Sequence, residues 1–338
     1  MINVWSYGLE YRKEKKEILK AVERVFDSGK LILGEEVERF EKEFSLYCGC
    51  KYGVGVNSGT DALFISLKAL GVGAGEEVIT VPNTAVPTVS AIKLTFAKPV
   101  FVDVLKDTML MDPSKLEGKI NQNTKVIIPV HLYGQMCNMD EIMRIARKHK
   151  LKVLEDCAQA AGAKWMGKRA GSFGDVAAFS FYPTKVLGGY GDGGMVVTNN
   201  KKLADFAKGF RQYEFGGINS RLDEVQAGIL RFKLKNIGKY IEKRKAIAKR
   251  YTEDLSGSPL ELPFVDKRAE PSWYLYVVRH PRRNEIIKYM KSKNILLNVS
   301  YKWTEKVFSL PIYPSFSIKE QEKVIRLIRR FFKNEKES

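Results

Sequence analysis

The 338-residue sequence has few residues of the types that build metal centres and disulfide frameworks, with only three histidines and four cysteines. No histidine lies near a cysteine at the spacing of a metal motif, and Cys48 and Cys50 form only an isolated C-x-C. Four reduced cysteines are typical of a cytosolic protein. We therefore expect no metal site and a cytoplasmic location.

Long apolar segments are also missing. No stretch approaches the length of a membrane span, and residues 1–18 contain no apolar signal core, so we expect neither a membrane partner nor export. Acidic residues are fewer than basic ones, 39 against 57, which gives a net charge of +18. A polyanionic partner is one interpretation of this charge. We favour a solvated surface without nucleic acid, because the lysines are interleaved with glutamates and no nucleic-acid motif accompanies them.

Most of the chain alternates between short apolar runs and helical patterns. Strand-like runs such as VGVN, VITVP and LKVLED alternate with amphipathic stretches such as SGTDALFISLKAL and MDEIMRIARKH. This alternation predicts an α/β fold with a mostly parallel central sheet that is covered on both faces. From about Leu222, a long helical segment leads into a smaller α+β region with strand-like runs at WYLYVVRH and ILLNVSY. We predict a large domain at 1–235, including an N-terminal helical segment, and a small C-terminal domain at 236–338.

The segment from Leu151 to Thr198 brings an acid, a hydroxyl and a lysine together. Asp156 closes the run LKVLED, and ligands bind at the carboxyl ends of parallel strands. Ser180 lies in a second apolar run, and Lys185 follows in a glycine-rich loop. This set suits pyridoxal phosphate, which needs a carboxylate for its ring nitrogen, donors for its phosphate and an amine for its aldehyde. A loop aspartate and a surface lysine are the alternative interpretation.

Two further positions fit the same cofactor. Ser58, Gly59 and Thr60 lie between a strand-like run and a helix, where free amides and the helix dipole favour a phosphate. An ordinary helix cap explains them equally well. Gln159 could donate to a phenolic oxygen or satisfy a loop backbone group. The run GYGDGG looks like a dinucleotide fingerprint, but its glycines precede a strand-like run instead of following one, so we reject that interpretation.

Nearly the whole chain, from about Ile18 to Tyr313, resembles the DegT/StrS family of sugar aminotransferases. The motifs that carry the resemblance are SGTDAL, PVFVDV, IIPVHLYGQ, EDCAQAAGA, GSFGDVAAFSFYPTK, GYGDGG and INSRLDEVQAGIL. The resemblance implies an aspartate-aminotransferase-like fold (pyridoxal-phosphate transferase type I) and a homodimer with a shared active site. It also implies transfer of an amino group from L-glutamate to carbon 3 or 4 of a nucleotide-linked keto sugar, with pyridoxal phosphate as the cofactor.

The resemblance also implies a role for each matching residue. Lys185 would form the Schiff base with the cofactor and then move the proton, while Asp156 would pair with the pyridine nitrogen. Gln159 would contact the phenolic oxygen. The phosphate would be held by Gly59, Thr60 and Ser180.

Two residues of the INSR motif are further candidates for ligand binding. Asn219 would reach the phosphate from the partner subunit, so that the dimer is needed for activity. Arg221 would bind an anionic group of the substrate, although a structural role beside Asp223 is an equally good interpretation.

The sequence departs from the family pattern around the substrate. Ala85 stands where members usually place an aromatic ring over the cofactor, and Ala161 stands where a histidine is common. The loop at 210–217 and the segment KWTEK are shorter than usual, and in the family both segments normally border the sugar-nucleotide pocket. A sugar dehydratase and a non-catalytic regulatory protein are the alternatives. We prefer the aminotransferase. The dehydratases have a histidine in place of Lys185, which argues against the first alternative. The presence of Lys185, Asp156 and Gln159 together argues against a protein that has lost turnover.

Overall fold

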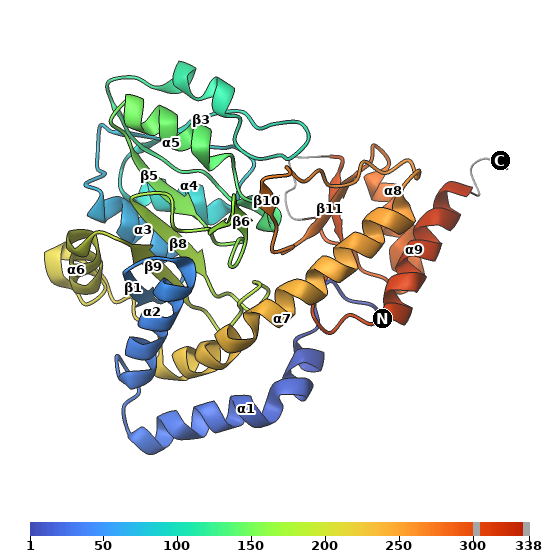
Figure 1. The fold of residues 1–338 in the computed structure, drawn as a ribbon, viewed down its shortest axis with the longest axis horizontal. Coiled ribbons are helices and arrows are strands. Elements are labelled where there is room, and N and C mark those ends of the chain that lie inside the picture. The colour runs from blue at the N-terminus through green and yellow to red at the C-terminus, as the bar shows by residue number, and fades with distance from the viewer. Residues whose placement is uncertain (300–304, 334–338) are drawn as a thin grey trace.

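The computed structural model describes residues 1–299 and 305–333 of the chain (Figure 1). Its centre is a seven-stranded sheet in the order β1-β9-β8-β5-β4-β2-β3. Every neighbouring pair is parallel except the two that involve β9, which runs antiparallel to β1 and β8. The α/β fold with a mostly parallel central sheet is therefore confirmed. The strands are β1 (Tyr52–Val56), β2 (Glu77–Thr80), β3 (Lys98–Phe101), β4 (Thr124–Ile127), β5 (Lys152–Asp156), β8 (Val176–Ser180) and β9 (Gly194–Thr198).

The central strands are apolar runs because helices cover both of their faces. Every residue of β2 and of β9 is buried, which requires cover above and below the sheet. α2 packs against β1, and α3 packs against β8 and β9. Helices in this half of the chain are α1 (Tyr7–Ser28), α2 (Glu35–Cys48), α3 (Gly59–Ala69), α4 (Val86–Leu94), α5 (Met139–Lys148) and α6 (Lys201–Phe210).

The C-terminal region contains a second, smaller core. Its antiparallel pair is β11 (Tyr276–Arg279) with β12 (Val307–Leu310), and its helices are α8 (Arg283–Ser292) and α9 (Ile318–Lys333). The strand that we predicted at ILLNVSY does not form over its described part, where Ile295 and Asn298 make only isolated bridges. The two bridges go to different segments, Ile295 to Ile2 and Asn298 to Ser309, and Asn294 turns the chain just before the run with a left-handed φ of 61°. Residues 300 and 301 of that run lie outside the described residues.

One long helix, α7 (Glu224–Leu255), connects the two cores and crosses the molecule diagonally in Figure 1. Its first half contributes Leu230 and Ile237 to the larger core, and its second half contributes Ile247 and Tyr251 to the smaller one. The boundary after residue 235 stays a prediction. Ile2 packs into the smaller core and Ala269 into the larger one, so both cores contain residues from both ends of the chain.

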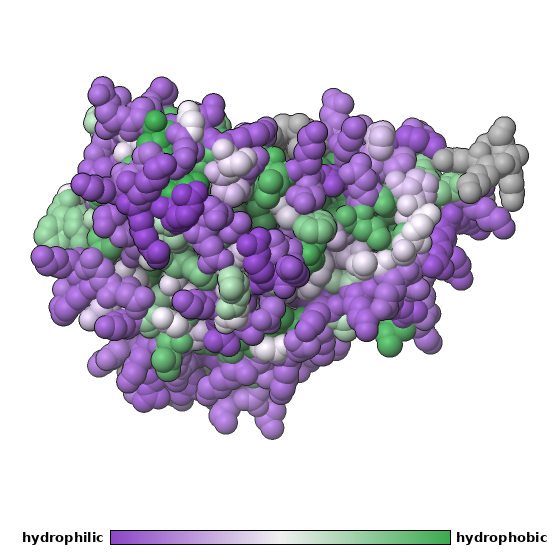
Figure 2. Space-filling model, turned by 45° about the horizontal axis from the view of Figure 1, so that its top comes forward, coloured by the Kyte–Doolittle hydropathy of each residue, from purple (hydrophilic) through white to green (hydrophobic). Residues whose placement is uncertain are grey.

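Three short strands complete the architecture. β6 (Lys164–Trp165) and β7 (Lys168–Arg169) form a small antiparallel sheet with β10 (Ala269–Glu270). Hydrophilic side chains cover most of the face shown in Figure 2. Within residues 1–299 and 305–333, no helix has the length and apolar character that crossing a membrane requires.

A buried carboxylate joins α7 to the start of α2. Glu224 accepts hydrogen bonds from the backbone amides of Gly34, Glu36 and Val37, at 2.8, 2.9 and 2.8 Å. These amides belong to the first turn of α2, where no helical carbonyl can reach them. The negative charge also meets the positive end of the helix dipole.

We expect Glu224→Ala to lower the free energy of unfolding by about 2–4 kcal/mol, because three amides lose a charged acceptor in a buried place. Urea denaturation measures the change. The control is Glu35→Ala on the exposed face of α2, which we expect to shift the same quantity by about 0.5 kcal/mol or less. Equal effects of the two substitutions would contradict the capping role of Glu224.

Candidate active site

The carboxyl ends of β1, β5 and β8 meet at one edge of the sheet, where ligands bind in open α/β folds. A cavity of about 500 Å³ opens at this edge. Six of the eight site residues that we predicted from the sequence line it: Gly59, Thr60, Asp156, Gln159, Ser180 and Lys185. Residues more than a hundred positions apart in the chain therefore share one cavity.

The remaining two predicted residues do not line the cavity of the single chain. Asn219 is exposed and forms an isolated bridge with Gln212. Arg221 is half-buried and also lies outside the cavity lining. Their neighbour Ser220 is buried, and its hydroxyl donates to Asp61 at 2.7 Å, which ties this segment to the first turn of α3.

One wall of the cavity is built for an anion. α3 begins at Gly59, and the Ser58 hydroxyl caps it by accepting from the Asp61 amide at 3.1 Å. The amides of Gly59 and Thr60 precede the first helical hydrogen bond, so they can donate to a phosphate. A Cβ on Gly59 would lie 2.6 Å from the Cβ of Ser180, so only glycine lets the helix start approach β8 this closely.

The floor of the cavity holds the carboxylate of Asp156, which is only 4% exposed. The Thr88 hydroxyl donates to Oδ2 at 2.7 Å, and the Ala158 amide donates to Oδ1 at 3.1 Å. Burial raises the pKa of Asp156, while these two hydrogen bonds and the positive charge of Lys185 act in the opposite direction. Asp156 forms no ion pair with any residue that the structure describes, so a protonated ring nitrogen in the cavity would meet an unpaired carboxylate.

Lys185 reaches the cavity from the loop after β8. A turn closed by its own amide and the Tyr182 carbonyl, at 2.8 Å, fixes its backbone. Its Nζ lies 4.7 Å from the centre of the Tyr274 ring, and the Tyr274 hydroxyl is 3.0 Å from the Thr184 hydroxyl. The aromatic ring therefore supports the ammonium from the small-core side.

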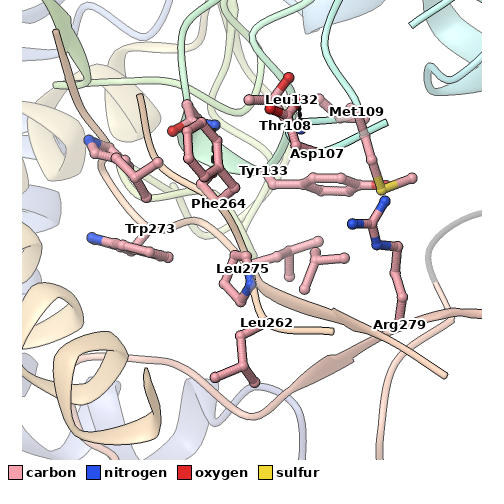
Figure 3. A pocket seen from close by; sticks show the side chains of 15 residues that line it. Asp107, Thr108, Met109, Leu132, Tyr133, Leu262, Phe264, Trp273, Leu275 and Arg279 are labelled. Carbon is pink, nitrogen blue, oxygen red and sulfur yellow. Dashed lines mark hydrogen bonds between the residues drawn. The ribbon is translucent and has the colours of Figure 1, made fainter. Parts of the chain in front are cut away.

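Gln159 is oriented by an unusual backbone conformation. Tyr133 has a left-handed φ of 61°, and its amide donates to Gln159 Oε1 at 2.8 Å. The Nε2 end is therefore the end that can donate to a phenolic oxygen. The ring of Tyr133 lies beside Met109 and Arg279 in a smaller neighbouring pocket (Figure 3), and Leu275 lines both pockets.

A second buried carboxylate supports the end of β5. Glu155 accepts from the amides of Gly171, Phe173 and Gly174, at 3.0, 2.7 and 2.8 Å. His131 Nδ1 accepts from the Cys137 amide, so the imidazole takes the tautomer whose Nε2–H donates to Glu155 at 3.0 Å. With Cys157, these groups bring potential metal ligands within 4.8 Å of one another, but hydrogen bonds already use the imidazole and the carboxylate.

Sequence reasoning missed several residues of the site. Thr88 lies in the segment PNTAVPT, where we looked only for an aromatic ring over the cofactor. Tyr274 and Tyr133 come from distant segments, and no local pattern marks them. Ala85 does line the cavity, and so do aromatic residues from other segments, namely Trp5, Tyr7 and Tyr182.

Comparison with known proteins gives one family. The DegT/DnrJ/EryC1/StrS aminotransferase family matches residues 12–303. A relative from Micromonospora megalomicea subsp. nigra, named dTDP-3-amino-3,4,6-trideoxy-alpha-D-glucose transaminase, is 47% identical over 96% of this chain and 97% of its own.

Two solved structures share the fold closely. DesV of S. venezuelae, solved in complex with a ketimine intermediate, superposes with a TM-score of 0.93 and 37% identity, covering 95% of this chain and 96% of its own. NtdA of Bacillus subtilis, solved with bound cofactor PMP, gives a TM-score of 0.88 and 31% identity, covering 95% and 82%. The central sheet and the second core thus have the arrangement of pyridoxal-phosphate-type aminotransferases.

The unpaired carboxylate of Asp156 makes a prediction for the cofactor-free protein. Because its pKa is raised in the native state, the native state holds this proton more tightly and loses stability as the pH rises through the raised pKa. We expect Asp156→Asn to raise the unfolding temperature at neutral pH, and the gain to shrink as the pH falls toward about 3.9, the ordinary value for aspartate.

Thermal unfolding followed by circular dichroism measures this difference. Asp192→Asn is the matched control, because Asp192 lines the same cavity but is exposed, and we expect no change from it. A lower unfolding temperature for cofactor-free Asp156→Asn at neutral pH would contradict the interpretation of Asp156 as a buried, unpaired charge.

Proposed function

Because the chain belongs to the DegT/DnrJ/EryC1/StrS aminotransferase family, we propose that it transfers an amino group from L-glutamate to a nucleotide-linked keto sugar with pyridoxal phosphate as cofactor. One observation carries the proposal. A lysine, an unpaired buried carboxylate and a helix N-terminus with free amides line a single cavity of about 500 Å³. These are the three groups that the cofactor requires: an amine for its aldehyde, a carboxylate for its ring nitrogen and donors for its phosphate.

Each cavity residue has a distinct part in this proposal. When bound, pyridoxal phosphate supplies the carbonyl that receives the amino group and a ring that takes up electrons. Asp156 would hold a proton on the ring nitrogen, which its buried carboxylate favours. Lys185 would bind the cofactor through Nζ and later carry a proton with the same atom. Gln159 would donate to the phenolic oxygen, and the amides of Gly59 and Thr60 with the Ser180 hydroxyl would hold the phosphate.

The name of the 47% identical relative gives the first substrate to test. That relative is a transaminase for a dTDP-linked sugar with its amino group on carbon 3. We infer that a dTDP-linked 3-keto deoxysugar belongs in the same place here. Lys185 argues against the dehydratase alternative, since it lines the cavity where that branch has histidine.

The proposal includes a homodimer with a shared site. Exposed apolar side chains lie on α4, on the edge strand β3 and on the turn between them: Val86, Leu94, Phe96 and Phe101. A second copy that covered this surface would remove these side chains from water. Asn219, which lies outside the cavity of its own chain, would then be available to the phosphate of the other. A cytoplasmic location fits the four buried free cysteines.

We expect the purified protein with pyridoxal phosphate to form 2-oxoglutarate and an amino sugar from L-glutamate and a dTDP-linked 3-keto sugar. A panel of nucleotide-linked 3-keto and 4-keto sugars, followed by mass spectrometry, measures this. Lys185→Ala should lower turnover at least about a hundredfold, because the proton carrier is lost. Lys168→Ala, at an exposed lysine, is the control and should keep full turnover. No product from any sugar of the panel would refute the proposed function.

A shared site predicts complementation between two inactive variants. Mixed dimers of Lys185→Ala and Asn219→Ala chains should each contain one intact site, so a statistical mixture should regain up to about a quarter of the wild-type activity. In the control, Lys185→Ala chains are mixed with chains that carry both substitutions, and no site is complete. If mixed dimers form without any recovered turnover, Asn219 does not act across the interface.

A further inference from the structure

A second cavity adjoins Lys185, between α1 and α7. Its volume is about 110 Å³, which is room for about three or four water molecules or one small anion. Lys185 lines both this cavity and the larger one. None of the roles assigned above uses it.

The lining of this second cavity is predominantly basic. Its acidic residues are Glu10 and Glu14, and its basic residues are Lys13, Lys185, Lys233, Lys243 and Arg244. Tyr240 donates to Glu14 Oε1 at 2.6 Å, which commits one oxygen of that carboxylate. Burial raises the pKa of Glu10, so this acid is a weakened counter-charge.

Lys233 is the most informative of the basic residues. It is only 6% exposed, and its Nζ lies 5.0 Å from the centre of the Tyr190 ring. It forms no ion pair with any residue of 1–299 and 305–333. Burial lowers its pKa, while Glu10 and Glu14 act in the opposite direction. A buried ammonium without a carboxylate in an ion pair is unfavourable, so an anion from solution would stabilise it.

Two further unused donors belong to residues that line the same cavity, Arg244 and Ser315. Arg244 is 3% exposed, and its Nη1 donates to the carbonyls of Trp273, Tyr274 and Ile312 at 3.3, 3.3 and 2.9 Å. Its Nε has no hydrogen-bond partner among the described residues, and the same holds for the Ser315 hydroxyl. Lys233, Arg244 and Ser315 therefore bring one ammonium and two unused donors to the lining of one cavity, which is the chemistry that binds a carboxylate or an oxyanion.

We propose that this cavity binds a small anion, held by Lys233, Arg244 Nε and Ser315. A carboxylate of the amino donor and an inorganic oxyanion are the two sources of this chemistry, and the first of them rests on the proposed function. An anion in this cavity would lie beside Lys185. Because Lys185 lines both cavities, an anion bound in the second cavity would act on the lysine of the first.

The test is isothermal titration calorimetry of the cofactor-loaded protein with two probes. Glutarate has the two carboxylates of glutamate but no amine, so it cannot react, and inorganic phosphate is the second probe. Lys233→Met should weaken the binding of at least one probe by about tenfold or more, because a charge-assisted contact is lost. Lys233→Arg should restore binding. Lys235→Met, an exposed lysine of the same helix, is the control for net charge.

The results separate the sources. If Lys233→Met weakens glutarate alone and raises the KM for L-glutamate without changing the KM for the sugar, the ligand is the donor carboxylate. If it weakens phosphate, the ligand is an inorganic oxyanion. Equal affinities in wild type and Lys233→Met would overturn the proposal and leave water as the only occupant, bridging Lys233 and Glu14 Oε2.

Stability provides an independent readout. Without an added anion, Lys233→Met should raise the unfolding temperature, since it removes an unpaired buried charge. Ser315→Ala serves as the second variant if Lys233→Met does not fold, and unchanged probe affinity in Ser315→Ala would then overturn the proposal. The turnover of the wild-type protein is measured separately. If no turnover is found, the proposed function is refuted, and the phosphate titration still tests the anion site.

Discussion

The buried carboxylate of Asp156 is the constraint around which the site is organised. Its backbone forms a parallel bridge with Val130, beyond the end of β4: the His131 amide donates to the Asp156 carbonyl and the Asp156 amide donates to the Pro129 carbonyl, both at 3.0 Å. The side chain is then held by Thr88 from α4. A charge in this position is unfavourable until a cation joins it, so the protonated ring nitrogen of the proposed cofactor would bind there favourably.

The sequence predicted the sheet well because a buried parallel strand has a simple pattern. The runs VGVN, VITVP and LKVLED became β1, β2 and β5, which are almost entirely buried, so no polar alternation is needed in them. Prediction failed over the described part of ILLNVSY, where composition favoured a strand but Ile295 and Asn298 form isolated bridges to different segments. It also missed α4, whose amphipathic pattern is weak, and α6, although the amphipathic pattern of α6 is clear.

The sequence could predict those site residues that lie at the end of a strand or at the start of a helix. Asp156, Ser180 and Gly59 each end a strand or begin a helix, so topology brings them together. Thr88 and Tyr274 could not be found, because their contacts depend on how α4 and the second core pack onto the sheet. Lys233 was hidden for the same reason. Within α7 it is one lysine among many, and only packing against α1 makes it a buried charge.

The loop before Asn219 is held in a compact conformation by contacts with α6 and within the loop itself. Phe215 stacks on Phe206 with the ring planes 12° apart, and the Ile218 amide returns to the Phe210 carbonyl at 2.9 Å. Ser220, fixed on Asp61, ends the segment. With both ends held, Asn219 has little freedom to turn into its own cavity. In the proposed homodimer, Asn219 would therefore reach a phosphate only across the interface, and completion of the site would depend on assembly of the dimer.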